Sequence, residues 1–562
     1  MAWLIPNHYY PWATFHTDAW VAVMLVMAGG AVFIRSNRKV EWHGITVVVA
    51  LLAAVPFVQF GFGMLSFSGE AWLITLYVLG LLLALLAGAH WEAATPGRAA
   101  DGLFLAIGIA AMVSVWLQLR QWLGYAAEVE TMQVWAAEFT RERPSANLGQ
   151  PNQLATLLLW GLMACLWGVV RKKINPPCAI LMALYLLFGI VLTQSRMPWI
   201  ALTAVTLAGF AWRKLLPART PWVFLLLLLY FSICTVSFSH LSEFLNLGLD
   251  IRSASLGGKS SQLRWKAIGM FLDALKQRPW TGYGWNQLAL AQLSVAKNHP
   301  NMTSFFIQSH NLLLDLMLWC GIPIGAGFFL CLSHWMLRCL KRVSNAEDLV
   351  LTLFVLVVAI HAMVEFPLHH AYFLLPTGVV MGMLNQRLKH HVIFKINRWP
   401  VIGLLFCTSL LLGAVIRDYF LVDADFRAYK LEVNHVGISS EIKSKDIYVL
   451  NDLRAFIENL RKEVQPNISA EELELLRRVT LSFPTPFNLF NYGKALAMRH
   501  ETLAAKDWLE KLQKLQPDAY LKNLQEVWQS QSRTEPAMAA VIWPPSDADR
   551  EQTKGLSKGI QQ

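Results

Sequence analysis

The chain has 562 residues, of which 55% are hydrophobic and only 15% charged, and its mean hydropathy is +0.41. Roughly a quarter of the residues of a soluble domain are charged, so this composition excludes a single soluble globule and indicates a polytopic membrane protein. The net charge of +11 does not indicate a nucleic-acid partner, because the basic residues stand in short clusters between apolar runs, as topology determinants do.

The chain opens with an interfacial segment, residues 1–18, in which Pro6 and Pro11 stand among aromatic residues. This segment does not read as a cleavable signal peptide. Apolar runs long enough to cross a bilayer, or nearly so, then follow in two groups, within 19–240 and 311–416. They fall at about 19–34, 44–62, 71–89, 101–122, 153–170, 178–194, 198–212, 221–240, 311–335, 349–366, 371–388 and 399–416. We therefore expect an all-α bundle of about twelve membrane helices, eight before a large polar loop at 241–310 and four after it.

Basic residues predict how the bundle is oriented. Alternate loops collect the clusters at 35–39, 98, 171–173, 213–219, 338–342 and 387–398 on one side, whereas the short loops of the other side hold only Arg141, Arg143 and Arg196. The positive-inside rule makes the first side cytoplasmic. The N-terminus, the 241–310 loop and everything after residue 416 are then expected to face outward.

The composition becomes that of a helical soluble domain over residues 417–530. Leu489, Tyr492, Gly493 and Leu496, followed by Ala505 and Leu509, reproduce the spacing of one tetratricopeptide unit. Such a unit would present a surface to a partner, although a generic helical hairpin without a partner fits the pattern equally well. The proline-rich and polar residues 531–562 are expected to form a disordered tail.

Seven cysteines lie in or beside apolar runs without a CxxC pair, so neither a disulfide framework nor a thiolate metal site is indicated.

His310 stands where the polar loop meets the ninth apolar run, and Asn311 follows it. A neutral imidazole at this water boundary is a candidate general base. The alternative is an interfacial histidine that only extends its polar tip toward water.

Cations on the outer side form a second candidate group. Arg196 lies in a very short turn close to the hydrocarbon, where an unpaired charge is costly. Arg264 and Lys266 open an amphipathic helix in the polar loop, where a single arginine would usually be a solvated charge. Together the three could bind a diphosphate, which guanidinium groups bind bidentately.

Two polar turns complete the candidate site. Asn147, Gln150, Asn152 and Gln153 form a carboxamide-rich turn suited to sugar hydroxyls or phosphate oxygens, with a helix-capping turn as the alternative. Glu365 lies in another short turn and should be paired, with Arg196 or His310 as partner. His370 and Tyr372 follow it, but adjacent histidines beside a glutamate fit no standard zinc spacing, so no metal site is expected.

These residues, in this order, resemble the O-antigen ligase and polymerase superfamily, and most closely its protein O-oligosaccharyltransferase branch. The resemblance rests on four features: the N-terminal His8, Pro11, Trp12, Phe15 and Asp18; the block from Asn147 to Asn152; the block of His310 and Asn311 followed by Leu318, Cys320, Gly321, Ile322 and Pro323; and the helical extension after the last span. Phe366 departs from the tyrosine that relatives often carry there, and Tyr372 is a possible substitute.

The resemblance implies an enzyme of the bacterial inner membrane that needs no cofactor. It would transfer a glycan from undecaprenyl diphosphate to a serine or threonine of an exported protein such as a pilin, with membrane lipids around it. His310 matches the family's essential histidine, Arg196 and Arg264 match its diphosphate arginines, and Gln150 and Gln153 lie where an essential glutamine is found.

Two other readings stay open. The first is an O-antigen ligase or polymerase that uses lipid A core or another glycan as acceptor, against which the outer helical domain argues. The second is a transporter of lipid-linked sugar, for which midplane polar residues or paired broken helices would be expected.

Overall fold

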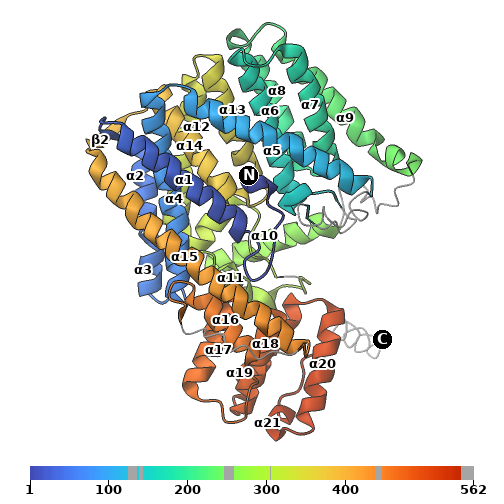
Figure 1. Cartoon of the computed structure of the whole chain (residues 1–562). Coiled ribbons are helices and arrows are strands. Elements are labelled where there is room, and N and C mark those ends of the chain that lie inside the picture. Colours follow the sequence, from blue (N-terminus) through green and yellow to red (C-terminus); the bar gives the residue numbers. More distant parts are fainter. Residues whose placement is uncertain (125–135, 138–142, 246–258, 304, 437–445, 546–562) are drawn as a thin grey trace.

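The computed structural model describes residues 1–124, 136–137, 143–245, 259–303, 305–436 and 446–545 (Figure 1). Helices dominate these residues, which confirms the helical fold class; a two-stranded sheet is the one departure from it in the described part. Every apolar run named above carries a helix. The bundle helices are α1 (Phe15–Arg35), α2 (Gly44–Leu52), α3 (Val55–Gly61), α4 (Ser68–Ala94), α5 (Arg98–Trp122), α6 (Pro151–Val170), α7 (Pro176–Leu192), α8 (Met197–Ala211), α9 (Thr220–Phe244), α12 (Leu312–Arg342), α13 (Ala346–Ala362), α14 (Ala371–Arg387) and α15 (Arg398–Val433).

Eight helical segments of the described part are long and apolar enough to cross a membrane, counting α2 and α3 together. Helices α7 and α8 are shorter apolar helices, and α13 and α14 have 17 residues each. The multi-pass architecture therefore stands, whereas the count of twelve crossings remains an expectation. The run at 44–62 is broken, since Pro56 has no N–H to donate to the preceding helical turn.

Helices α4 and α14 form the centre of the bundle. A Cβ atom at Gly88 would lie 2.1 Å from the carbonyl oxygen of Val379, and one at Gly382 would lie 2.2 Å from that of Leu85. Only a glycine allows two backbones to approach this closely, and small residues serve this purpose in membrane helices.

The basic loops gather at one end of the bundle. Strand β1 (Val40–His43) pairs antiparallel with β2 (Val392–Ile396). Arg387 forms ion pairs with Glu92, Glu347 and Asp348 at 2.6–2.8 Å, and Arg171 pairs with Asp101 and Glu347. These contacts join loops that the charge pattern assigns to the same side. The side of the membrane they face remains an expectation.

Helix α12 contains a sharp break at Gly321, whose backbone is left-handed (φ 77°). The carbonyls of Leu318 and Trp319, freed by the break, accept hydrogen bonds from the N–H groups of Tyr283 and Gly284 at 2.7 and 3.1 Å. The apolar run that begins at residue 311 is therefore a short helix that ends at the break, followed by a longer one. His310 lies in the turn directly before the short helix.

Two layers cover the other end of the bundle. Helices α10 (Lys259–Gln277) and α11 (Leu288–Val295) lie between the bundle and a C-terminal group, α16 (Asn451–Arg461), α17 (Ala470–Ser482), α18 (Pro486–Met498), α19 (Thr502–Leu515), α20 (Asp518–Ser532) and α21 (Pro536–Ala539) (Figure 1). Helices α18 and α19 form the predicted hairpin, with Leu489 and Leu509 fully buried. Its assignment as a tetratricopeptide unit remains an expectation.

Two boundaries differ from the prediction. Helix α15 continues to Val433 without a break at residue 416, because Asp418 in its middle accepts the backbone N–H groups of residues 448–450 and ties the helix to the start of α16. The predicted disordered tail is wrong for residues 531–545, since Met538 and Val541 are buried against Trp528. Residues 546–562 lie outside the described residues.

Candidate active site

His310 occupies the turn before α12 in a left-handed backbone conformation (φ 61°). For a residue with a side chain this conformation costs about 1 kcal/mol and persists only where the surroundings hold it. Both neighbours are anchored. The N–H of Ser309 donates to Asp315 at 2.8 Å, and the Asn311 side chain caps α12 through the N–H of Leu314 at 3.1 Å. Asn311, predicted to bind substrate, thus holds the turn in place.

Glu365 is the centre of the site. Its side chain is 5% exposed; one oxygen, Oε2, lies 3.0 Å from Nδ1 of His310, and the other, Oε1, accepts from Arg264 at 2.5 Å and from Asn152 at 2.9 Å. Burial raises the pKa of Glu365, but its hydrogen bond with His310 and the nearby charges outweigh burial, so the net pKa is lowered. An ionised carboxylate only accepts, so Nδ1 carries the proton and Nε2 of His310 is the basic nitrogen.

Asn152 extends this cluster toward the turn between α7 and α8. Its Oδ1 accepts from Ser195 Oγ at 2.7 Å and from Arg143 at 3.3 Å, and Arg143 also donates to the carbonyl of Thr193 at 2.7 Å. Arg143 was not among the predicted site residues. The one signal for it was its position in a loop on the side that the charge pattern predicts to be outside, where cations are rare. The neighbouring cation in this loop, Arg141, lies outside the described residues.

The two remaining predicted cations are exposed and lie close in the chain to residues of the cluster. Arg196 directly follows Ser195, at the position before α8, and its side chain is exposed. Lys266 is exposed two residues after Arg264 on α10. Residues two apart on a helix do not share a face, so Lys266 points away from the direction taken by Arg264.

A second polar group surrounds Gln153. Its amide donates to Nε2 of His370 at 2.6 Å, while the Tyr372 hydroxyl donates to its Oε1. Burial lowers the pKa of His370 to about 3, so the ring is neutral and accepts this bond. Gln153 of α6 is buried, and its amide is held by two residues at the start of α14.

Gln150 and Asn147, two predicted substrate-binding residues, have structural partners. Gln150 caps α6 by accepting the N–H of Gln153 at 2.7 Å, which matches the capping alternative for this turn. Asn147 is buried, donates to the carbonyl of Leu4 at 2.8 Å and accepts the N–H of Ala137 at 3.0 Å.

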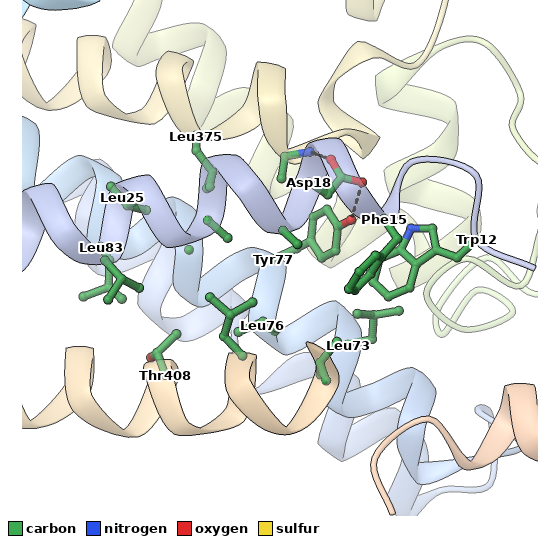
Figure 2. A pocket seen from close by; sticks show the side chains of 17 residues that line it. Trp12, Phe15, Asp18, Leu25, Leu73, Leu76, Tyr77, Leu83, Leu375 and Thr408 are labelled. Atoms are coloured by element: carbon green, nitrogen blue, oxygen red, sulfur yellow. Dashed lines mark hydrogen bonds between the residues drawn. The ribbon is translucent and has the colours of Figure 1, made fainter. Parts of the chain in front are cut away.

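The N-terminal segment reaches the same region through Asp18 (Figure 2). This buried carboxylate accepts from the Tyr77 hydroxyl at 2.9 Å, from Thr14 at 2.6 Å and from the N–H of Ala371 at 2.7 Å. Ala371 stands between His370 and Tyr372, the two partners of Gln153. Asp18 therefore fixes the start of α14 beside the second polar group.

An apolar cavity of about 650 Å³ opens beside His370 of the second polar group. It runs between α2, α4, α12, α13 and α14, and its lining extends along α12 from Leu312 to Leu337. His369, His370 and Met363 line its polar end, and the carbonyl of Met363 accepts from Asn311 at 3.1 Å. A long hydrocarbon chain would fit this lining, with its polar head near His310.

No group of three or more histidine, cysteine, aspartate or glutamate side chains within the described ranges is arranged to hold a metal ion.

A helical membrane bundle that combines a carboxylate-oriented histidine, an arginine and an apolar cavity has the elements that a membrane-embedded transferase needs. Comparison with known proteins shows which membrane-embedded transferases this chain is similar to. Residues 181–330 match the O-antigen ligase family, residues 349–531 the C-terminal part of the virulence factor membrane-bound polymerases, and residues 144–167 the protein glycosylation ligases.

Two curated relatives come from Acinetobacter baylyi. The general O-oligosaccharyltransferase is 27% identical over 541 residues, which cover 94% of this chain and 92% of that protein. The ComP-specific O-oligosaccharyltransferase is 27% identical over 321 residues, 56% of each chain. These matches confirm the resemblance to the O-antigen ligase superfamily and its protein O-oligosaccharyltransferase branch, and they support a glycosyltransferase.

Proposed function

We propose that the chain transfers a preassembled glycan en bloc from undecaprenyl diphosphate to serine or threonine hydroxyls of an exported protein, such as a pilin, at the periplasmic face of the inner membrane. The observation that carries this proposal is the contact of one buried carboxylate, Glu365, with both His310 and Arg264. This arrangement supplies a base and a cation within one site.

The proposed reaction is a single displacement. The acceptor hydroxyl gives its proton to Nε2 of His310 while its oxygen attacks the anomeric carbon of the glycan. The bond from that carbon to the phosphate oxygen breaks, and the lipid diphosphate leaves with the electron pair. Glu365 stabilises the imidazolium that forms. Arg264, with Arg196 at the border, stabilises the charge on the departing diphosphate.

The cavity supports a lipid-linked donor. Its apolar lining suits a polyprenyl chain, and the end near His369 and His370 brings the attached diphosphate close to the cation cluster. Asn152 and Gln153 stand between this end and Glu365, where a sugar or phosphate would contact carboxamides. The lipid diphosphate is already activated, so the reaction needs no nucleotide and no metal.

The acceptor is the part of the proposal with a competing candidate. The matches to O-antigen ligases and polymerases favour a glycan or lipid acceptor, while the match to protein glycosylation ligases and the relatives' names favour a protein. The C-terminal helices lie next to the His310 loop and offer a protein-sized surface, so the protein acceptor is preferred.

Reconstitution tests the proposal. The purified protein, in liposomes with lipid-linked oligosaccharide, is offered either a pilin or lipid A core, and each acceptor is followed by intact mass. We expect the pilin alone to gain the mass of one glycan. Arg264→Gln should slow this gain, whereas Lys276→Gln, on the same helix and with its described ion pair to Asp273 one turn away, should not. Mass gain on lipid A core alone would establish the competing function.

A further inference from the structure

The loop that leads to His310 is attached to the C-terminal helices. The N–H of Met302 donates to the carbonyl of Lys514 at 2.9 Å. The side-chain amide of Asn301 donates to the carbonyl of Gln516 at 3.1 Å and to Asp518 at 3.3 Å. All three acceptors lie at the turn between α19 and α20, so this turn holds the loop eight residues before His310.

Helix α11 and the residues after it share a core with the same helices. Leu293 and Ala296 are buried in one apolar cluster with Leu509 and Leu512 of α19. At its edge, Lys297 forms ion pairs with Asp507 at 2.8 Å and Glu510 at 2.9 Å. The outer loop and the C-terminal helices are therefore one packed unit.

This unit is also fastened to the bundle at a second place. Asn451, at the start of α16, accepts the N–H of Gly69 at 3.0 Å and donates to Ser68 at 2.8 Å, both at the start of α4. Arg478 of α17 donates to the carbonyl of Ser66. The C-terminal helices are thus held against the membrane part and can act as a fixed support for the loop.

Two described residues between this anchor and His310 are also held by hydrogen bonds. The N–H of Phe306 donates to Gln292 of α11 at 3.0 Å, and the amide of Gln308 donates to Nδ1 of His369 at 2.9 Å. Thr303 and His310 both have left-handed backbones, with φ values of 51° and 61°. Such backbone conformations persist where the surrounding contacts hold them.

We propose that the C-terminal helical domain is part of the catalytic scaffold, in which Asn301 and Lys297 are positioning residues that hold the His310 loop. This inference rests on the proposed transfer reaction. The domain then has a role that is separate from acceptor recognition. Loss of its contacts with the loop lowers the rate of transfer to every acceptor.

Transfer to two acceptors of different size distinguishes a scaffold role of the C-terminal domain from a role in acceptor recognition. Transfer by the full-length protein in liposomes is measured with an intact pilin and with a short serine-containing peptide. Asn301→Asp removes the amide donor and places a carboxylate beside Asp518. We expect kcat to fall about tenfold with both acceptors, while KM for each changes less than about twofold. Asn523→Asp, the same change at an exposed site on α20, should leave kcat unchanged.

A charge exchange between Lys297 and its two partners shows whether a loss of kcat comes from the lost ion pairs or from a folding defect. Lys297→Glu should lower kcat with both acceptors, and Lys297→Glu combined with Asp507→Lys and Glu510→Lys should recover most of the loss because the ion pairs re-form. The inference is overturned if Asn301→Asp and Lys297→Glu keep kcat within about twofold of the parent, or if only transfer to the intact pilin is affected. A parent protein that glycosylates neither acceptor would instead refute the proposed function.

Discussion

Glu365→Gln removes one charge from the centre of the site and changes little else. Oε1 of Glu365 accepts two hydrogen bonds, from Arg264 and Asn152, so the amide oxygen of a glutamine would stay there. The amide nitrogen then replaces Oε2 and faces Nδ1 of His310, to which it can only donate. The proton of the ring moves to Nε2, and the basic nitrogen that should face the acceptor is lost.

The expected loss of activity is large. A hydrogen bond to a charged group contributes about 1.5–3 kcal/mol, which alone corresponds to roughly 10–150-fold in rate. The change of tautomer adds to this, so kcat for glycan transfer should fall at least about 100-fold while KM for the lipid donor stays within about threefold. The assay is the rate of mass gain by the acceptor in liposomes, at a saturating concentration of each substrate.

Glu347→Gln is the matched control. Glu347 also pairs with two arginines, Arg171 and Arg387, but at the basic end of the bundle. It should lower thermal stability without changing kcat. The reasoning about Glu365 is refuted if Glu365→Gln transfers glycan within about threefold of the parent rate, since the tautomer of His310 would then not depend on the carboxylate.

Three further predictions concern the fold and its orientation. Gly321→Ala should destabilise the protein by more than about 1–2 kcal/mol, because the backbone of this residue is left-handed and an added Cβ would lie 2.2 Å from the Trp280 carbonyl oxygen. Gly327→Ala, with open space around it on the same helix, should not lower the unfolding temperature. Burial, reinforced by the charge of Glu70, raises the pKa of Asp452 to about 7. The native state therefore holds this proton more tightly than the unfolded chain, and the stability of the protein falls as the pH rises from about 4 to about 7. Asp452→Asn should reduce the drop in unfolding temperature between pH 5 and pH 8, and an unchanged drop would contradict this. A cysteine at the exposed position Lys522 should react with a membrane-impermeant maleimide in cells with a permeabilised outer membrane, while one at Lys172 should not; the opposite pattern would reverse the orientation.

The positions of the helices could be read from the sequence because hydrocarbon thickness sets a minimum length for an apolar run. Their irregularities were harder to predict. The run at 44–62 carries its break signal in Pro56, and the run that begins at 311 carries Gly321, but an apolar run alone does not say whether such a residue kinks or ends a helix. The break at Gly321 depends on donors from residues 283 and 284, which lie far away in the chain.

The candidate site was partly predictable for a similar reason. A carboxylate in a short turn near the membrane must be paired, and this correctly assigned His310 as a partner of Glu365. Glu365 also pairs with Arg264, which the sequence had not suggested as its partner. Arg143 carries no periodic signal, and its role becomes visible only when α6 brings Asn152 beside it.

The attachment of the C-terminal helices to the loop before His310 left no trace in the sequence. The bond between Met302 and Lys514 joins two backbones, and backbone groups are the same for every residue type.

The tail was misjudged because composition averages over a segment. Three apolar residues, Met538, Val541 and Trp543, are enough to pack it on Phe490 and Trp528 within an otherwise polar stretch.

The central claim is that His310 takes the proton of the acceptor hydroxyl, and His310→Gln tests it most directly. Glutamine keeps a polar side chain of similar size but is not a base. In liposomes with lipid-linked oligosaccharide and pilin, we predict that the mass gain of the pilin slows about 10²–10⁴-fold, with KM for the donor nearly unchanged and with His334→Gln, at an exposed position of α12, as active as the parent. Glycan transfer by His310→Gln at the parent rate would contradict the account.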